Sequence, residues 1–187
     1  MTDMFYRLCK NCRASNAATA KECSQCSAPM PAKATLFLSY SHKDKKYAED
    51  FLTHLAALKR SEQVEVWYDK DIDAGRGWEQ EIDNNLLIAD VILLLISASF
   101  LNSDYCYSIE AKCALERYRE RNACVIPVLI RPVEWSDTPF HHIQAVPRGG
   151  KPVQSWPDAD AAFLNVVQEI KNAITNRYGI APKKPTW

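Results

Sequence analysis

The sequence predicts an α/β protein, in which helices cover both faces of a parallel sheet, preceded by a small N-terminal metal-binding module. Two observations lead to this prediction. From residue 35 onward, apolar strand-like runs alternate with amphipathic helical segments, which is the pattern of consecutive parallel strand–helix–strand units. Ahead of them, four cysteines form two closely spaced pairs.

The composition is that of a globular protein, with 47% hydrophobic residues and a formal net charge of zero over 187 residues. A neutral chain lacks the basic footprint of nucleic-acid-binding proteins, so nucleic acid is not an expected partner. The apolar run VILLLI is far shorter than a membrane-spanning helix, and the start MTDMFYRLCKNC has no signal-peptide core. We therefore expect a soluble, cytoplasmic protein without a membrane partner.

The N-terminal cysteines have the spacing of a structural zinc site, C-x2-C-x10-C-x2-C, formed by Cys9, Cys12, Cys23 and Cys26. The segment has few large apolar side chains, so metal binding would supply its folding energy. An iron site and unliganded cysteines in a flexible arm are the alternatives. Four protein ligands leave no open position for a substrate, so a zinc ion here is expected to be structural.

The first strand and helix follow a short linker, SAPMPAKAT at 27–35, which contains two prolines. TLFLSY at 35–40 is predicted as a buried strand. The segment 41–58 is predicted as a helix because apolar residues recur on one face, namely Tyr47, Phe51, Leu55 and Leu58. Ser41 and Asp44 have the spacing of a capping box, with Asp in place of the usual Glu or Gln.

The next elements continue the alternation. VEVWYD at 64–69 predicts a strand, and WEQEIDNNLLIA at 78–89 predicts a helix after a loop with two glycines. DVILLLIS at 90–97 and ACVIPVLIR at 123–131 are uninterrupted apolar runs, typical of strands that are covered on both faces. Between these two runs, a helix is predicted with one apolar face formed by Ala111, Ala114, Leu115 and Tyr118.

The chain closes with a short extended piece near KPVQSW at 151–156, predicted as a fifth strand, and a helix at 158–178. The helix presents an apolar face of Phe163, Val166, Val167, Ile170 and Ile174. The predicted organisation is therefore a zinc ribbon with its linker at 1–33, an α/β domain at 34–178 and a C-terminal tail at 179–187.

Glu110 is the unusual residue at the predicted ligand-binding edge. In parallel sheets, ligands bind beyond the carboxyl ends of the strands, and the segments 40–42, 69–78 and 97–110 all follow strand ends. Glu110 has no basic partner three or four positions further along its helix, where ion pairs form. The alternative interpretation is an acidic residue favoured near a helix start by the helix dipole.

Four stretches, in this order and at these distances, resemble a bacterial Toll/interleukin-1 receptor (TIR) domain: LFLSYSHKD, VWYDKDIDAGRGWEQEI, ADVILLLISASFLNSDYCYSIE and VIPVLIRPVEW. The resemblance covers roughly residues 35–178. It implies a flavodoxin-like, doubly wound, five-stranded parallel sheet with a mobile loop at about 69–77. In many members it also implies cleavage of NAD+ at the nicotinamide glycosidic bond, with the catalytic glutamate at Glu110.

The residues near this edge supply further candidates for binding NAD+: Tyr40, Ser41, Arg76, Trp78, Tyr105 and Tyr107. Tyr40 and Ser41 equally suit a strand end and a helix cap. Arg76 suits contact with phosphates or with a neighbouring copy. The resemblance has one departure, because catalytic members commonly have a tryptophan four residues before the glutamate, where this chain has Cys106.

The predicted function is that of an NAD+ glycohydrolase or cyclase that releases nicotinamide and either ADP-ribose or a cyclic isomer. No G-x-G-x-x-G fingerprint is present, so NAD+ is expected as a substrate and not as a recycled cofactor. The resemblance further implies activation by self-association through TIR–TIR contacts, in antiphage defence or signalling. The alternatives are a non-catalytic adaptor that recruits another TIR protein, and a zinc module that itself binds a partner.

Overall fold

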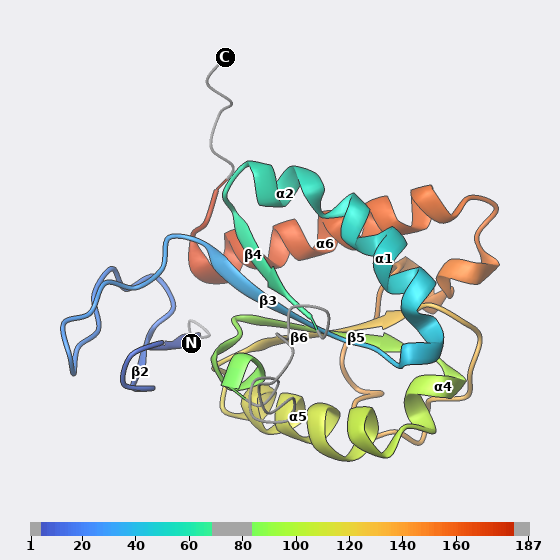
Figure 1. The fold of residues 1–187 in the computed structure, drawn as a ribbon, viewed down its shortest axis with the longest axis horizontal. Coiled ribbons are helices and arrows are strands. Elements are labelled where there is room, and N and C mark those ends of the chain that lie inside the picture. Colours follow the sequence, from blue (N-terminus) through green and yellow to red (C-terminus); the bar gives the residue numbers. More distant parts are fainter. Residues whose placement is uncertain (1–4, 69–83, 182–187) are drawn as a thin grey trace, which may run out of the picture.

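The computed structural model describes residues 5–68 and 84–181, without the side chain of Tyr105. Four parallel strands form its central sheet, in the order β4-β3-β5-β6 (Figure 1). They are β3 (Ala34–Ser39), β4 (Val64–Trp67), β5 (Val91–Ile96) and β6 (Cys124–Leu129). Every residue of β3, β5 and β6 is buried, since helices cover both faces, which confirms the predicted doubly wound α/β fold.

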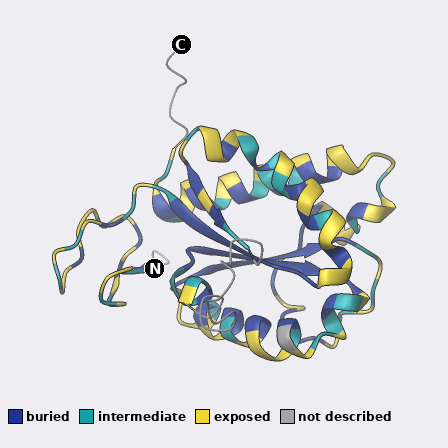
Figure 2. Cartoon of the chain, viewed as in Figure 1, coloured by how far each residue is buried: buried dark blue, intermediate teal, exposed yellow. Residues whose placement is uncertain are grey.

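The two faces of the sheet carry separate apolar cores. The α6 face is covered by α1 (Lys45–His54), α2 (Ala56–Arg60) and α6 (Ala159–Tyr178), and the α5 face by α4 (Ala98–Leu101) and α5 (Ala111–Arg119) (Figure 1). Side chains along a strand alternate between these faces. Leu36 and Leu38 of β3 therefore join the core of the α6 face, whereas Phe37 joins that of the α5 face. Figure 2 shows the buried strands between helices whose outer surfaces are exposed.

The predicted fifth strand at 151–156 is wrong. The chain returns beside β6 but makes one isolated parallel bridge there, between Val146 and Val128. Pro147 follows and has no backbone N–H, so it cannot extend a ladder. Val153–Ser155 then form a short 3-10 turn, and the described part of the sheet has four strands.

Two predicted helices are divided. The segment predicted at 41–58 forms η1 (His42–Asp44), α1 and α2. The expected capping box is absent because the Ser41 side chain makes no capping hydrogen bond. The helix that carries Glu110 begins with a π-helical segment, η3 (Tyr105–Glu110), and continues as α5. Of the helix predicted at 78–89, residues 84–88 are helical and the earlier part lies outside the described residues.

The N-terminal module lies beside the starts of the sheet strands, on the opposite side of the sheet from the strand ends (Figure 1). Its two short strands, β1 (Tyr6–Leu8) and β2 (Ser15–Ala17), pair antiparallel. Within residues 5–68 and 84–181, no helix has the length and apolar character that crossing a membrane requires.

Candidate active site and metal centre

Glu110 lies at the junction of η3 and α5, as the last residue of the π-helical segment. Glu110 is 5% exposed. Glutamate is seldom buried to this extent unless it is paired. Short π-helical segments within helices are frequent at functional sites. The predicted catalytic residue is therefore a buried acid and not a solvent-exposed helix-start residue.

Ser39 is a hydrogen-bond partner of Glu110. Ser39 ends β3 and is 1% exposed. Its hydroxyl donates a hydrogen bond to Oε2 of Glu110. Because side chains alternate along a strand, Ser39 points to the α5 face, like Phe37, and this is the face on which Glu110 lies. Ser39 is absent from the residues predicted from the sequence, although its position two residues after Phe37 was a usable signal.

Tyr40 and Ser41, the next two candidates, directly follow β3 and are both buried. Tyr40 is buried and joins the apolar core of the α6 face, on the other side of the sheet from Glu110. Its backbone carbonyl, however, accepts a hydrogen bond from the Cys106 thiol at 3.5 Å. Ser41 is also buried, directly before η1.

The aromatic candidates beside Glu110 are only partly described. Tyr107 is half-buried, and its ring meets that of Phe140 edge to face with centroids 6.2 Å apart. Cys106, at the position of the family tryptophan, is buried in the core of the α5 face. The side chain of Tyr105, together with Arg76 and Trp78, lies outside the described residues.

A second buried carboxylate, Asp44, is the last residue of η1, which follows the end of β3. It accepts a hydrogen bond from the Ser97 hydroxyl, and both residues are at most 1% exposed. Nη2 of Arg131 lies 2.8 Å from Oδ1 of Asp44. This contact is an ion pair without hydrogen-bond alignment. These contacts fasten η1 to the end of β5, so we assign them a structural role.

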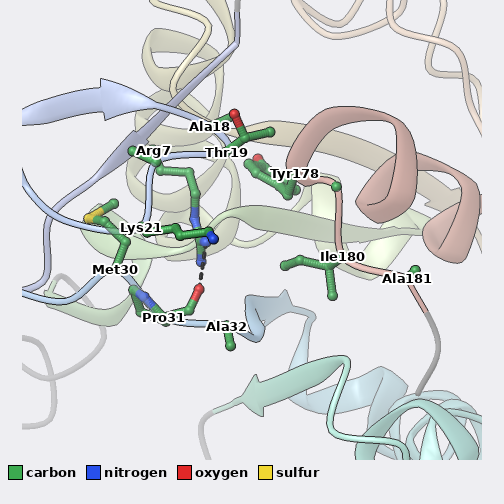
Figure 3. Close-up of a pocket in the computed structure, with 12 residues that line it drawn as sticks. Arg7, Ala18, Thr19, Lys21, Met30, Pro31, Ala32, Tyr178, Ile180 and Ala181 are labelled. Atoms are coloured by element: carbon green, nitrogen blue, oxygen red, sulfur yellow. Dashed lines mark hydrogen bonds between the residues drawn. The ribbon is translucent and has the colours of Figure 1, made fainter. Parts of the chain in front are cut away.

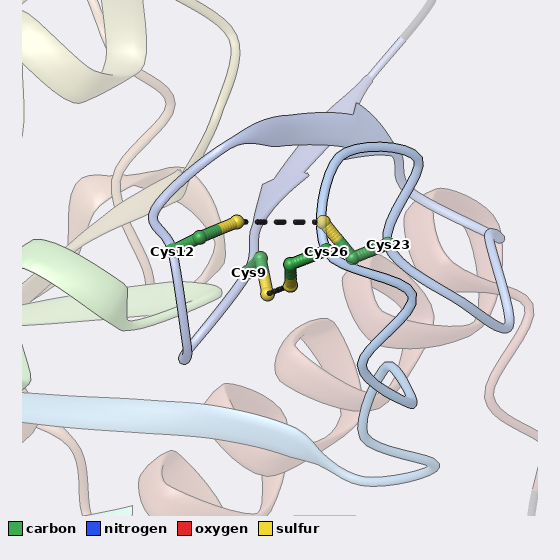
Figure 4. A group of neighbouring side chains, drawn as sticks. All are labelled: Cys9, Cys12, Cys23 and Cys26. Carbon is green, nitrogen blue, oxygen red and sulfur yellow. Dashed lines mark hydrogen bonds between the residues drawn. The ribbon is translucent and has the colours of Figure 1, made fainter.

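The four N-terminal cysteines form one cluster, as their spacing predicted. Their sulfur atoms all lie within 4.8 Å of one another and point toward a common centre (Figure 4). The Sγ atoms of Cys9 and Cys26 are 3.7 Å apart and those of Cys12 and Cys23 are 3.6 Å apart. Thiolates held tetrahedrally about 2.3 Å from a zinc ion are separated by about 3.8 Å, whereas a disulfide needs about 2.05 Å. The donor set therefore fits a tetrahedral metal ion.

Both cysteine pairs use the same backbone turn. In the first, the N–H of Arg13 donates to the carbonyl of Cys9 at 2.8 Å, and in the second, the N–H of Ser27 donates to Cys23 at 2.9 Å. Arg13 and Ser27 both have positive φ, 59° and 56°, a conformation that few non-glycine residues adopt. The module is thus built from two matching turns that each present two thiols.

Nearby N–H groups favour the thiolate form of the second pair. The backbone N–H groups of Cys26 and Gln25 lower the pKa of Cys23 to about 6. The side-chain amide of Asn11, 3.5 Å from Sγ of Cys26, lowers the pKa of that thiol. Metal binding requires deprotonated thiols, so these donors favour ligation near neutral pH.

Arg7 attaches the module to the α/β domain. Its Nε and Nη2 donate to the two carboxylate oxygens of Asp90, at 2.8 and 2.7 Å, directly before β5. The same guanidinium donates to the carbonyl oxygens of Pro31 and Lys33 in the linker, at 2.8 and 2.9 Å. Arg7 and Asp90 are each 3% exposed. The linker is consequently held in place by the residue that joins the two parts.

A cavity of about 410 Å³ remains beside this junction (Figure 3). It lies between the module and the end of α6, and its lining includes Lys21, Met30, Tyr178 and Ile180. The Tyr178 hydroxyl donates to the carbonyl oxygen of Asp90 at 2.6 Å. The guanidinium of Arg7 stacks over the Tyr178 ring at 5.4 Å, so α6 supports the same contact.

Comparison with known proteins places these features in a family. A family model described as TIR domain matches residues 36–176. An uncharacterized protein, y4lF, from Sinorhizobium fredii (strain NBRC 101917 / NGR234) is 43% identical over 139 residues. The matched stretch covers 74% of this chain and 43% of that relative, so the chain spans less than half of the relative's length.

Proposed function

We propose that this chain, which belongs to the TIR domain family, cleaves the nicotinamide–ribose bond of NAD+. The TIR family includes NAD-cleaving enzymes and non-catalytic members. The observation that carries the proposal is Glu110, a buried carboxylate near the carboxyl-terminal edge of the sheet, where ligands bind in parallel α/β folds. A carboxylate is costly to bury, and stabilisation of a positive charge on a bound ribose gives a reason to keep one at this position.

One carboxylate is sufficient for this chemistry. The pyridinium of NAD+ is cationic, and nicotinamide takes the electron pair of the breaking bond and leaves as a neutral base. No general acid is needed, in contrast to glycosidases that use a pair of carboxylates. Glu110 stabilises the positive charge that grows on the ribose and binds the ribose hydroxyls. The low local dielectric around a buried carboxylate strengthens this interaction.

The second half of the reaction decides the product. Attack of water on the ribose carbon gives ADP-ribose and a proton. Attack by adenine or a ribose hydroxyl of the same molecule gives a cyclic isomer, provided that the site excludes water. Both products follow from the same cleavage, so Glu110 has the same role in each.

Assembly belongs to the same proposal. Copies associate through TIR–TIR contacts, and the loop of one copy at about 69–77 completes the site of the next. Tyr40, Ser41, Arg76, Trp78, Tyr105 and Tyr107 are the proposed NAD+-binding residues. The setting is antiphage defence or signalling, with structural zinc bound by the four cysteines and a protein partner for the zinc module.

The test is NAD+ consumption, followed by chromatography of the products, for wild type and Glu110→Gln. The matched control is Glu116→Gln, which changes an exposed acid on the same helix. Each protein is assayed at several concentrations, with and without a crowding agent. We expect turnover in wild type and Glu116→Gln that rises with concentration, and none in Glu110→Gln. Equal turnover in all three would contradict the proposed role of Glu110.

The alternative function is a non-catalytic interaction module that recruits another TIR protein. The observation in its favour is Cys106, which is buried where catalytic relatives commonly have tryptophan. Absence of turnover in wild type under every assembling condition would support this alternative.

A further inference from the structure

We propose that Ser39 is a positioning residue that fixes the carboxylate of Glu110 for NAD+ cleavage. This inference rests on the proposed function and adds a residue to it. Its basis is the hydrogen bond from the Ser39 hydroxyl to Oε2 of Glu110, between side chains that are 1% and 5% exposed.

The hydrogen bond suits the surroundings of both groups. Ser39 faces the α5 side of the sheet, where its strand neighbour Phe37 belongs to an apolar core, and a hydroxyl buried there needs a hydrogen-bond partner. Glu110 is a carboxylate next to the same core, and burial of a charged group without donors is costly. A bond between a hydroxyl and a carboxylate is stronger than one between neutral groups.

The bond also connects a less regular element to a rigid one. Glu110 ends a π-helical segment, whose wider turn departs from the regular α-helix. Ser39 belongs to β3, which is paired on both sides, with β4 and β5. The hydrogen bond therefore fixes the position of the carboxylate relative to the centre of the sheet. A carboxylate held in this way is in place before the ribose charge develops, and such preorganisation is the main source of electrostatic catalysis.

The chain contains a matched control for this role. Ser97 also follows a central strand, is fully buried and donates to a buried carboxylate, that of Asp44. Ser97 also caps α4, because its Oγ accepts a hydrogen bond from the backbone N–H of Phe100 at 3.0 Å, and its carboxylate partner has the structural role described above. Ser97→Ala therefore removes a hydroxyl–carboxylate hydrogen bond that does not involve Glu110, together with the cap of α4.

The experiment measures kcat, KM and the melting temperature for the full chain with Ser39→Ala, Ser39→Thr or Ser97→Ala. We expect kcat of Ser39→Ala to fall about 10- to 100-fold, with KM within about threefold of wild type. Ser39→Thr keeps the hydroxyl. The logarithm of its kcat is expected to lie at least about a third of the way from the Ser39→Ala value to the wild-type value. Ser97→Ala is expected to lower the melting temperature while kcat per folded molecule stays unchanged.

Three results overturn the inference. The first is a wild-type kcat in Ser39→Ala while Glu110→Gln is inactive, which leaves the proposed function intact. The second is a rate for Ser39→Thr no higher than for Ser39→Ala, and the third is an equal loss of kcat in Ser97→Ala. A wild-type protein that consumes no NAD+ overturns the proposed function, and the role of Ser39 with it.

Discussion

Replacement of Arg7 by alanine is expected to destabilise the α/β domain, although Arg7 belongs to the N-terminal module. The Asp90 carboxylate, which is 3% exposed, also accepts a hydrogen bond from the backbone N–H of Thr35 at 2.8 Å, and removal of the guanidinium takes away its charged partner. Two linker carbonyls lose donors as well. Loss of one partner of a buried ion pair costs about 3–5 kcal/mol, which for a chain of this size lowers the melting temperature by about 6–20 °C.

The assay is thermal and urea denaturation of metal-loaded protein, followed by circular dichroism. Lys10→Ala is the matched control, because Lys10 pairs with Glu65 across the same junction at 3.1 Å but both side chains are exposed, 37% and 63%. An exposed pair contributes about 0–1 kcal/mol, so this variant should melt within about 4 °C of wild type. If Arg7→Ala melts no lower than Lys10→Ala, the buried contact does not join the two parts as argued.

Two further predictions concern cysteines. Elemental analysis is expected to find one zinc ion per wild-type chain and none in Cys12→Ser. The melting temperature of Cys12→Ser should fall toward that of Arg7→Ala, because loss of the metal unfolds the module whose strand β1 carries Arg7. A metal-free wild-type protein of unchanged stability would contradict this prediction. Cys106→Trp restores the family residue at a position that is 6% exposed, so overpacking is expected to cost about 1–3 kcal/mol or more without raising NAD+ turnover per folded molecule. Denaturation and the chromatographic assay check this variant against Cys106→Ala, and a stable, more active tryptophan variant would contradict it.

The doubly wound fold could be predicted from the sequence because each buried strand is marked by its own local run of apolar residues. Runs such as VILLLI are apolar throughout, and a strand of this kind requires cover on both faces. The prediction of a fifth strand was wrong for an equally local reason. The chain meets β6 at Val146, ahead of KPVQSW, and Pro147 follows directly and cannot extend the ladder. The cysteine spacing correctly predicted that four thiols converge, and the identity of the metal stays a prediction.

The side chains around Glu110 were harder to predict, because a one-residue difference along a strand changes the face of the sheet. Tyr40, which follows the first strand, packs on the α6 face, whereas Ser39 beside it points to Glu110. The contact between Arg7 and Asp90 joins residues 83 positions apart. No periodicity or spacing in the sequence relates two such distant positions, so only the folded arrangement reveals it.

The module and Glu110 lie at opposite ends of the same strands, and this separation places the metal-binding cysteines and the proposed catalytic carboxylate on opposite sides of the domain. The turns of the module carry exposed residues such as Gln25 and Ser27, and the module lies beside the starts of the strands (Figure 1). Under the proposed function, a protein that binds those turns would leave the opposite edge open to NAD+ and to other copies. Substitutions at these exposed turns are therefore expected to alter binding of the proposed partner without altering NAD+ turnover.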